Sequence, residues 1–497
     1  MKIHKPVFLK LVCALSALTG SFGLVFGLAA LNNTSLFVDF DHPTNTISYF
    51  DETPQETKWN VEGSDKPFET SGSAVSLDNQ TNKQDKFNFA ALVVDGATHQ
   101  VLDKSFNQSG YQGLVDWIWT DDWYHNRNHI NVSEPATHYD NNKPGSGNGV
   151  KPSTDNANDF WITYENLIKN GCKSLVLPGY MHQNGLQNFE NKSKDTYLNA
   201  GYILLDANEP NDKNIASVIF RSDEAAFMSG IATCQYLNDN FDEYKSGGLR
   251  VGTFGGIAIP SVTIYMGGFE YGIKIWNDNI NAIAQSKKWE NPDEHKVNII
   301  NLGTKDSWFS NSFSIGDGNP IAKSLLQRGA DAILPVAGPQ TTDTVRQIKA
   351  SGSNCIVVGV DTAQENDPTS NETSKYTDVS GNNQIIKFSA TKNIADMTSK
   401  VLSLAMAHLS VDEDDQNVGS WGWLTVGDVN NKGITPSEGA FPYLIEFIEN
   451  ATGALPPQPT EDPYDYILTK LANFSDDEID YFDQNHISNK DFMQLRI

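Results

Sequence analysis

The chain has few cysteines and few basic residues for its length, and both shortages exclude classes of protein. Its 497 residues include four cysteines, which lie far apart and form no CxxC pair. A disulfide framework or a cysteine-ligated zinc site is therefore not expected. Acidic residues outnumber basic ones by 62 to 36, for a formal net charge of −26. Nucleic acid is not expected as a partner, because binding it would need a basic patch that neutralises phosphate groups.

A long apolar run lies at the N-terminus. Three lysines and a histidine precede residues 11–31, which are uncharged, largely apolar and long enough to cross a bilayer as a helix. We expect residues 1–31 to be a signal peptide or membrane anchor, with the rest of the chain on the extracellular face of the cell membrane. A retained anchor is favoured, and cleavage near Ala29 is the alternative. Cys13 stands at the front of the run, whereas a bacterial lipoprotein cysteine would follow it, so no lipid is assigned.

The composition of the chain changes after the apolar run. Residues 32–86 are rich in Thr, Asn, Asp, Gln and Ser without sustained apolar periodicity, which predicts a polar stalk. Further on, short apolar runs alternate with longer helix-like segments, the pattern of parallel sheets with crossover helices. The expected strands are 89–94, 173–178, 202–206, 217–220, 250–254, 297–302, 332–336 and 355–361. Because the pattern repeats on both sides of residue 250, we expect two doubly wound α/β domains.

Residues that a ligand could approach follow several of these strands. Asp95 comes directly after the first strand, and the loop 102–110 then supplies an acid, an aromatic and an amide. In open α/β sheets ligands bind beyond the carboxyl ends of the strands, so this is a candidate binding loop, with a turn and helix cap as the alternative. Tyr265 and Phe269 lie one turn apart on a later predicted helix. They could flank a planar ligand or belong to the core.

Five segments of the chain match a known family as a set. They are 103–107 (DKSFN), 222–230 (SDEAAFMSG), 255–260 (GGIAIP) with 268–272 (GFEYG), 336–338 (VAG) and 359–361 (GVD). In order and approximate spacing, from about residue 88 to 430, they resemble the basic membrane protein family, the purine-nucleoside-type substrate-binding receptors of ABC transporters. The resemblance implies a type I periplasmic-binding-protein fold, in which several hinge crossovers join two α/β lobes and the ligand is held in the cleft.

The resemblance also implies residues that hold the base. Phe106 resembles the aromatic that stacks on the nucleobase, with Phe269 or Tyr265 closing the opposite face. Stacking suits a purine, whose two faces are flat and apolar. Asn107 and Asp95 match positions near the base edge, where an amide or carboxylate can pair with ring donors and acceptors.

A second set of residues is implied at the sugar. Asp361 resembles the carboxylate that binds the ribose hydroxyls, and Lys392 resembles the lysine beside it. Vicinal hydroxyls offer two donors to one carboxylate, and an ammonium can satisfy the remaining lone pairs. Gly338 would let the backbone approach the ligand. Asp223 is a further candidate that could instead cap the helix after it.

The chain also departs from the family. The segment 96–101 (GATHQV) replaces a glycine-rich link, and polar insertions lie at 119–159 and 362–384. His125 and His129 in the first insertion stand at helical spacing, but the loop composition around them does not favour a metal site. We expect the following division: 1–31 signal or anchor, 32–86 stalk, 87–249 with 389–412 lobe 1, 250–388 with 413–450 lobe 2, and 451–497 a C-terminal tail.

The function that the resemblance implies is extracellular capture of a nucleoside, without a cofactor, and its delivery to ABC permease and ATPase subunits. Two other binding functions stay open: a surface adhesin that retains the receptor fold, and a receptor for another planar ligand such as a flavin. A nucleoside-cleaving enzyme is disfavoured, because the sequence contains neither a clustered carboxylate metal motif nor a Walker-type loop.

Overall fold

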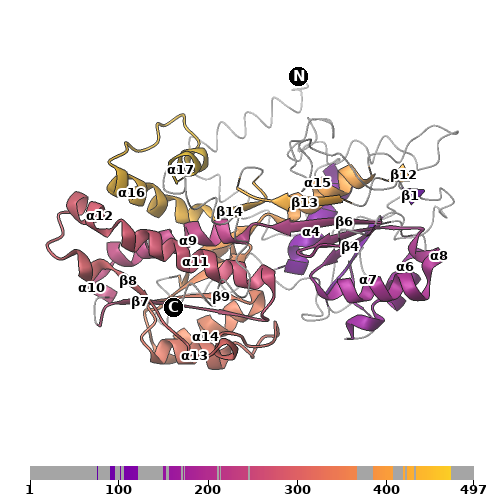
Figure 1. Cartoon of the computed structure of the whole chain (residues 1–497), viewed down its shortest axis with the longest axis horizontal. Helices are drawn as coiled ribbons and strands as arrows, with labels where there is room; N and C mark the ends of the chain where they lie inside the picture. The colour runs from indigo at the N-terminus through magenta and orange to yellow at the C-terminus, as the bar shows by residue number, and fades with distance from the viewer. Residues whose placement is uncertain are drawn as a thin grey trace, which may run out of the picture.

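The computed structural model describes the chain in segments, drawn in colour in Figure 1. These are residues 75–76, 90–95, 101, 106–120, 149–152, 156–169, 172, 174–209, 212, 214–244, 247–366, 384–406, 418–419, 423–429 and 432–471. They form two lobes that lie side by side, each built around its own sheet.

The sheet of lobe 1 has six parallel strands in the order β13-β6-β5-β4-β2-β3. The strands are β2 (Ala90–Val93), β3 (Gly149–Val150), β4 (Ser174–Pro178), β5 (Gly201–Leu205), β6 (Ile215–Phe220) and β13 (Trp423–Gly427). Leaving out β13, the first strand of the lobe lies between the second and the third. This is the doubly wound order in which ligands bind beside the first strand, at the switch point of the sheet.

Lobe 2 repeats this order with its own strands, β14-β11-β10-β9-β7-β8. They are β7 (Leu249–Gly255), β8 (Val297–Ile299), β9 (Ala332–Val336), β10 (Ile356–Asp361), β11 (Ile386–Lys392) and β14 (Ile434–Pro436). All pairs are parallel except β11 with β14 at the edge. The expected fold class, two doubly wound lobes of the type I periplasmic-binding-protein kind, is confirmed.

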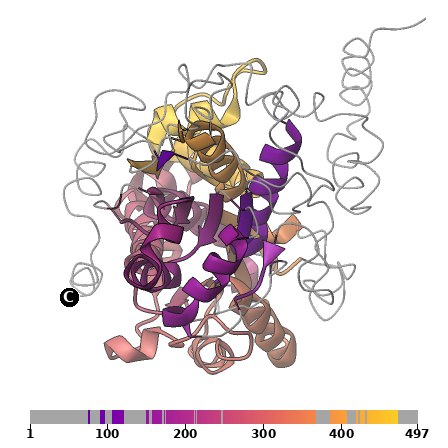
Figure 2. The same cartoon turned by 90° about the vertical axis from the view of Figure 1, so that its right-hand side faces the viewer.

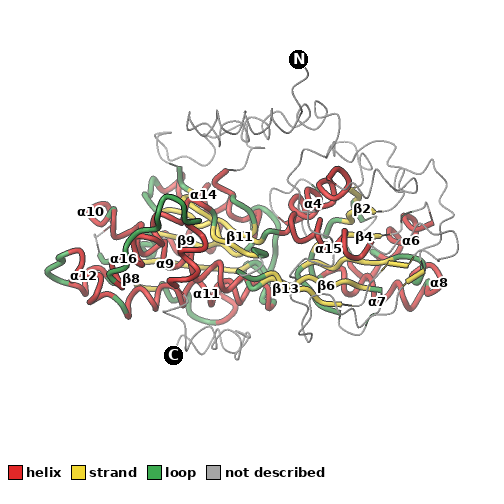
Figure 3. The backbone as a smooth tube through the Cα atoms, turned by 90° about the horizontal axis from the view of Figure 1, so that it is seen from above, coloured by secondary structure: helices red, strands yellow, loops and turns green. Residues whose placement is uncertain are grey.

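Helices cover both faces of each sheet (Figures 1 and 3). In lobe 1 they are α4 (Phe106–Thr120) and α15 (Ile394–Met406) on one face, with α6 (Trp161–Lys169), α7 (Met181–Lys192) and α8 (Lys194–Tyr197) on the other. Successive strand residues therefore enter different cores: Leu92 and Val176 belong to one buried cluster, Val93 and Leu175 to another. Burial on both faces explains why these strands are continuous apolar runs.

In lobe 2 two long helices lie against one face of the sheet and two shorter ones against the other (Figure 1). They are α9 (Ser222–Asp239) and α11 (Pro260–Asp278) on one face, and α13 (Asn319–Gln327) and α14 (Thr341–Ser351) on the other. The remaining helices of this lobe are α10 (Phe241–Tyr244), α12 (Ile280–Lys287), α16 (Phe441–Thr452) and α17 (Pro463–Leu471). As the sequence predicts, α11 begins at Pro260, whose fixed φ suits the first helical position.

Glycines let α9 and α11 approach closely. A Cβ atom on Gly268 would lie 2.2 Å from the carbonyl oxygen of Asp223, and one on Gly272 would lie 2.1 Å from that of Phe227. Both distances are far inside van der Waals contact, so no larger side chain fits unless the helices separate.

Within the described residues, three connections cross between the lobes: β6 to α9, β11 to α15, and β13 to β14. The lobes therefore divide differently from the boundaries expected at residues 249 and 388. The helix 222–239 packs on α11 in lobe 2, all of β11 lies in the lobe 2 sheet, and β13 joins the lobe 1 sheet. The apolar pattern of a helix does not specify which sheet it covers, and this is why the boundaries shift.

Several predictions lie outside the described residues: the membrane segment 1–31, nearly all of the stalk 32–86, and His125 with His129. Among the helices that the structure describes, none combines the length and the apolar character that crossing a bilayer requires. Three cysteines are described, Cys172, Cys234 and Cys355; all are buried free thiols.

Candidate functional site

A cavity lies between the lobes, where the carboxyl ends of both sheets meet. About 670 Å³ of space lies between its lining atoms, including the open mouth. Lobe 1 contributes Asp95, Phe106, Gly179, Tyr180, Met181 and Asp206. Lobe 2 contributes Ile259, Ser261, Val262, Tyr265, Phe313, Val336, Ala337, Gly338, Pro339, Asp361 and Lys392.

A buried lysine links carboxylates from the two lobes. Lys392, the last residue of β11, has its Nζ atom 2.8 Å from Oδ2 of Asp206 and 3.6 Å from Oδ1 of Asp361. Asp206 follows β5 in lobe 1, and Asp361 ends β10 in lobe 2. The lysine side chain is 3% exposed. At such distances and burial, attraction to opposite charges is much stronger than at an open surface.

The surroundings of Lys392 keep it protonated. Burial disfavours its charge, but Asp206 and Asp361 outweigh burial, and the pKa of Lys392 is raised. Burial raises the pKa of Asp206, while Lys392 acts in the opposite direction. The Nζ atom also lies 5.4 Å from the ring centre of Phe106 and 5.1 Å from that of Tyr265, within the range of cation–π attraction. The cavity therefore holds one fixed cation between two carboxylates.

Asp95 and Asn107 form a pair at the lobe 1 side of the cavity. The backbone N–H of Asp95 donates to Oδ1 of Asn107 at 3.1 Å, and Nδ2 of Asn107 donates to Oδ1 of Asp95 at 3.3 Å. Asn107 is fully buried and does not line the cavity, whereas Asp95 does. Of the two residues predicted at the base edge, Asp95 faces the cavity and Asn107 orients Asp95.

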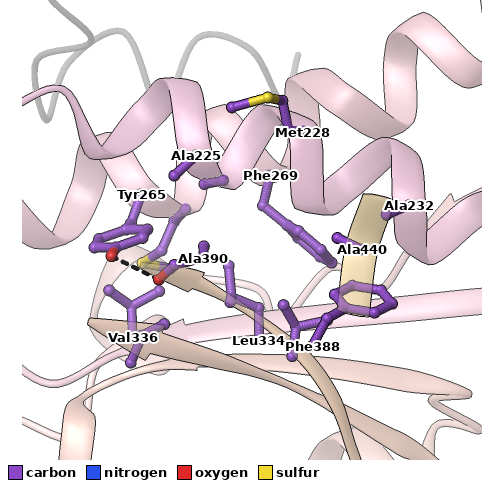
Figure 4. Packing of buried hydrophobic residues seen from close by; sticks show 14 of the residues in the cluster. Ala225, Met228, Ala232, Tyr265, Phe269, Leu334, Val336, Phe388, Ala390 and Ala440 are labelled. Carbon is purple, nitrogen blue, oxygen red and sulfur yellow. Dashed lines mark hydrogen bonds between the residues drawn. The ribbon is translucent and has the colours of Figure 1, made fainter. Parts of the chain in front are cut away.

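Tyr265 lies beneath the lysine and makes two hydrogen bonds with its hydroxyl. The hydroxyl donates to the carbonyl oxygen of Ala390 at 2.9 Å and accepts from the backbone N–H of Asp361 at 3.3 Å. Figure 4 shows the first of these bonds, from α11 to β11. Burial raises the pKa of Tyr265, so the phenol stays neutral and can donate.

Besides Asn107, two more predicted ligand residues do not line this cavity. Phe269 is fully buried and points away from Tyr265, toward Phe388 and Ala440 (Figure 4). Four residues along a helix advance the chain by about 6 Å, which carries Phe269 past the cavity into the core. Asp223 is buried against Arg221, with Oδ2 and Nη2 3.1 Å apart. Its carboxylate is engaged at the first crossover instead.

Other cavity residues were not expected from the sequence. Asp206 is an acid at the end of a predicted strand, a signal equal to the one that marks Asp361. Phe313 lies in the loop between β8 and α13, where no periodic pattern places a side chain. Tyr180 and Met181 follow β4 and line the cavity from lobe 1. Gly338, predicted to let the backbone approach the ligand, lines the cavity with φ +42, in the left-handed region that favours glycine.

The fold and the cleft together define a two-lobed protein of the type I periplasmic-binding-protein class. Residues 87–296 match the family described as ABC transporter substrate-binding protein PnrA-like. A lipoprotein of Mycoplasma genitalium, MG040, is 28% identical over 417 residues, or 71% of this chain and 68% of the relative. Its Mycoplasma pneumoniae homologue is 26% identical, covering 71% of this chain and 62% of the relative.

More distant relatives carry names from the same family. A Lactococcus lactis protein named ABC transporter nucleoside-binding protein BmpA is 24% identical over 56% of this chain and 64% of its own. Basic membrane protein B of Borreliella burgdorferi is 26% identical over 40% of this chain and 50% of its own. An ABC transporter solute-binding protein from Aeropyrum pernix is 18% identical, with a TM-score of 0.48 over 82% of this chain and 89% of its own. The family match and the names of these relatives agree with the resemblance to the basic membrane protein family that the motifs predict.

Proposed function

We propose that this chain is the substrate-binding subunit of an ABC transporter and that it captures a purine nucleoside in the cleft between its lobes. The observation that carries the proposal is the group formed by Lys392, Asp206 and Asp361 beside the ring of Phe106. Carboxylates accept hydrogen bonds from vicinal sugar hydroxyls, and the ammonium donates to the hydroxyl oxygens. An aromatic ring beside them provides a flat surface for a base.

The charge of the cavity favours an uncharged nucleoside over a nucleotide. Three of its lining residues are carboxylic acids, Asp95, Asp206 and Asp361, while Lys392 is the only lysine or arginine among them. The negative charge of a phosphate group would be repelled by these carboxylates, and the single cation beside them is already paired. Burial of the phosphate in this lining would therefore weaken binding. Sugar hydroxyls and ring N–H groups, in contrast, are donors that carboxylates accept.

The base would lie between aromatic rings supplied by opposite lobes. Phe106 begins α4 in lobe 1, and Phe313 precedes α13 in lobe 2; both line the cavity. Closure of the lobes about the three crossovers would bring the rings onto the two faces of the base and exclude water. Asp95, oriented by Asn107, is then available to a base edge that carries N–H donors.

The relatives support a transport role at the membrane. One is named as a nucleoside-binding protein of an ABC transporter, and two are named as lipoproteins. We therefore place this receptor on the extracellular face, tethered to the membrane, where it passes its ligand to permease and ATPase subunits. The role is binding without conversion of the ligand.

Mass spectrometry of small molecules released from the purified full chain tests the proposal, followed by calorimetric titration with guanosine, inosine, adenosine, riboflavin and GMP. We expect an intact purine nucleoside to be released and a nucleoside to bind far more tightly than GMP. Preferred riboflavin binding would establish another planar ligand, a converted product would establish an enzyme, and absence of binding would favour an adhesin. Each of these three results contradicts the proposal.

Removal of one site carboxylate sharpens this test. Asp361→Ala should weaken nucleoside binding by about 2 kcal/mol or more, because the sugar hydroxyls lose an acceptor and Lys392 loses one of its two carboxylates. Asp278→Ala on the exposed end of α11 removes a carboxylate paired with Lys274 and is the matched control. It should leave the affinity unchanged.

A further inference from the structure

The hydroxyl of Tyr265 connects three elements that build the cavity. It extends from α11, donates to Ala390 in β11 and accepts from the backbone of Asp361 at the end of β10. Ala390 stands two residues before Lys392, and Asp361 is paired in register with Thr391. One hydroxyl is therefore bonded to both strands that carry the charged residues of lobe 2.

Asp361 has a backbone conformation that needs support. Its φ is +65, in the left-handed region that residues other than glycine enter with a steric penalty. Its backbone N–H donates to the Tyr265 hydroxyl. The preceding amide, of Val360, donates to the Oε1 atom of buried Gln364 at 3.0 Å. Side chains from outside the strand thus hold both backbone amides at the point where the carboxylate enters the cavity.

We infer that Tyr265 is a positioning residue for the hydroxyl-bearing part of the ligand. Its hydroxyl fixes the turn at Asp361 relative to Lys392, so that carboxylate and ammonium face the cavity together. The inference rests on the proposed function, since it assigns these two groups to the sugar. Its ring has a separate effect, because it lies under the Lys392 ammonium and packs in the core. Tyr265→Phe retains that ring and removes the positioning bonds alone.

The test compares nucleoside with free base on the full chain. The probes are the nucleoside among guanosine, inosine and adenosine that binds the wild type best, and the free base of that nucleoside. In Tyr265→Phe we expect the dissociation constant of the nucleoside to rise about tenfold and that of the base to change by less than about twofold. A general loss of packing would weaken both probes equally, which would overturn the inference, as would unchanged binding of both.

Tyr202→Phe is the matched control. Tyr202 is also fully buried, and its hydroxyl donates to the backbone carbonyl of Tyr197 at 2.8 Å, at the opposite end of β5 from Asp206. It should lose a similar amount of stability and bind both probes as the wild type does. If Tyr202→Phe also loses nucleoside binding selectively, the effect is not specific to Asp361 and the inference fails.

A crystal structure of Tyr265→Phe separates this inference from the proposed function. If the wild type binds no nucleoside, the proposed function is rejected, and the geometry at Asp361 still decides the role of Tyr265. We expect the φ angle of Asp361 or its distance to Lys392 to change. Retention of φ near +65 and of a separation near 3.6 Å would show that the hydroxyl does not position this residue.

Discussion

Asp206 and Asp361 occupy equivalent positions in the two lobes. Each comes at the end of the fourth strand of its doubly wound sheet, β5 or β10, and each has a left-handed backbone, with φ of +64 and +65. Both carboxylates face the ammonium of Lys392. A left-handed aspartate thus ends the fourth strand in each lobe, and the ammonium of Lys392 lies between the two carboxylates. Attraction of that cation to both carboxylates favours contact between the lobes.

Replacement of this cation should affect both stability and binding. Lys392→Met leaves two carboxylates facing each other without compensation, so we expect the free energy of unfolding to fall by about 3 kcal/mol. Nucleoside affinity should fall about 100-fold, which corresponds to about 2.8 kcal/mol. Chemical denaturation and calorimetry measure the two effects.

The control for Lys392→Met is Lys274→Met. Lys274 pairs with Asp278 on the surface of α11, and both side chains are about half exposed. Such a pair contributes at most about 1 kcal/mol, so stability and affinity should change little. Equal effects of the two substitutions would show that the buried lysine has no special role.

The two phenylalanines predicted to hold the base should respond in opposite ways. Phe106→Ala removes a ring that lines the cavity, so nucleoside affinity should fall by about 1–3 kcal/mol with the fold retained. Phe269→Ala creates a hole in the core, so the free energy of unfolding should fall by about 3–5 kcal/mol. Titration of the remaining folded Phe269→Ala protein should give the wild-type affinity. A selective loss of affinity in that variant would show that Phe269 contributes to ligand binding.

Local features of the fold are the part that the sequence predicts well. The run 250–254 becomes β7 (Leu249–Gly255), and Pro260 begins the next helix. Apolar runs and proline predict these elements well because their effect on the backbone is local in the sequence. Asp95, Phe106 and Lys392, which the sequence predicts as ligand residues, also line the cavity. Their positions follow from the rule that ligands meet the carboxyl ends of parallel strands.

Features that depend on distant contacts are harder to predict. Tyr265 and Phe269 are aromatic residues one turn apart, and the sequence does not distinguish their roles. The elements packed around α11 decide that Tyr265 lines the cavity and Phe269 lies in the core. Phe313 reaches the cavity from a loop without periodicity. The lobe to which α9 belongs depends on its glycine contact with α11, which no single-helix pattern reveals.

The close contact between α9 and α11 should make Gly268 intolerant of substitution. In Gly268→Ala the new Cβ would collide with the backbone of Asp223, so the helices must separate, and we expect a loss of about 2 kcal/mol or more in stability. Gly110→Ala is the control, because its Cβ would meet only side-chain atoms, the nearest being Leu92 at 3.2 Å. Alanine also gains helix propensity there. Urea denaturation compares the two; equal stability would mean that the helices can part without cost.

Glu224, beside the first and third crossovers, should make the stability of the protein depend on pH. The Glu224 side chain is 17% exposed; its carboxyl accepts a hydrogen bond from the backbone N–H of Val429 at 3.0 Å, and its Oε1 atom lies 3.6 Å from Nη2 of Arg221. Burial, followed by the negative charge of Asp223, raises the pKa of Glu224 to about 8. The carboxyl is therefore protonated in the folded protein near neutral pH.

Because the folded pKa of Glu224 lies above its unfolded value, the folded state binds the extra proton between these two values. Its contribution to stability is full below the unfolded pKa and is lost as the pH rises through about 8. Glu224→Gln mimics the protonated carboxyl, so its stability should fall less than that of the wild type between pH 5 and pH 9, by about 2 kcal/mol or more. Glu243→Gln, on the exposed face of α10, is the control and should follow the wild-type curve. Urea denaturation at each pH measures the free energy of unfolding. If this free energy changes with pH in parallel for wild type and Glu224→Gln, Glu224 is charged in the folded state and the crossovers accommodate that charge.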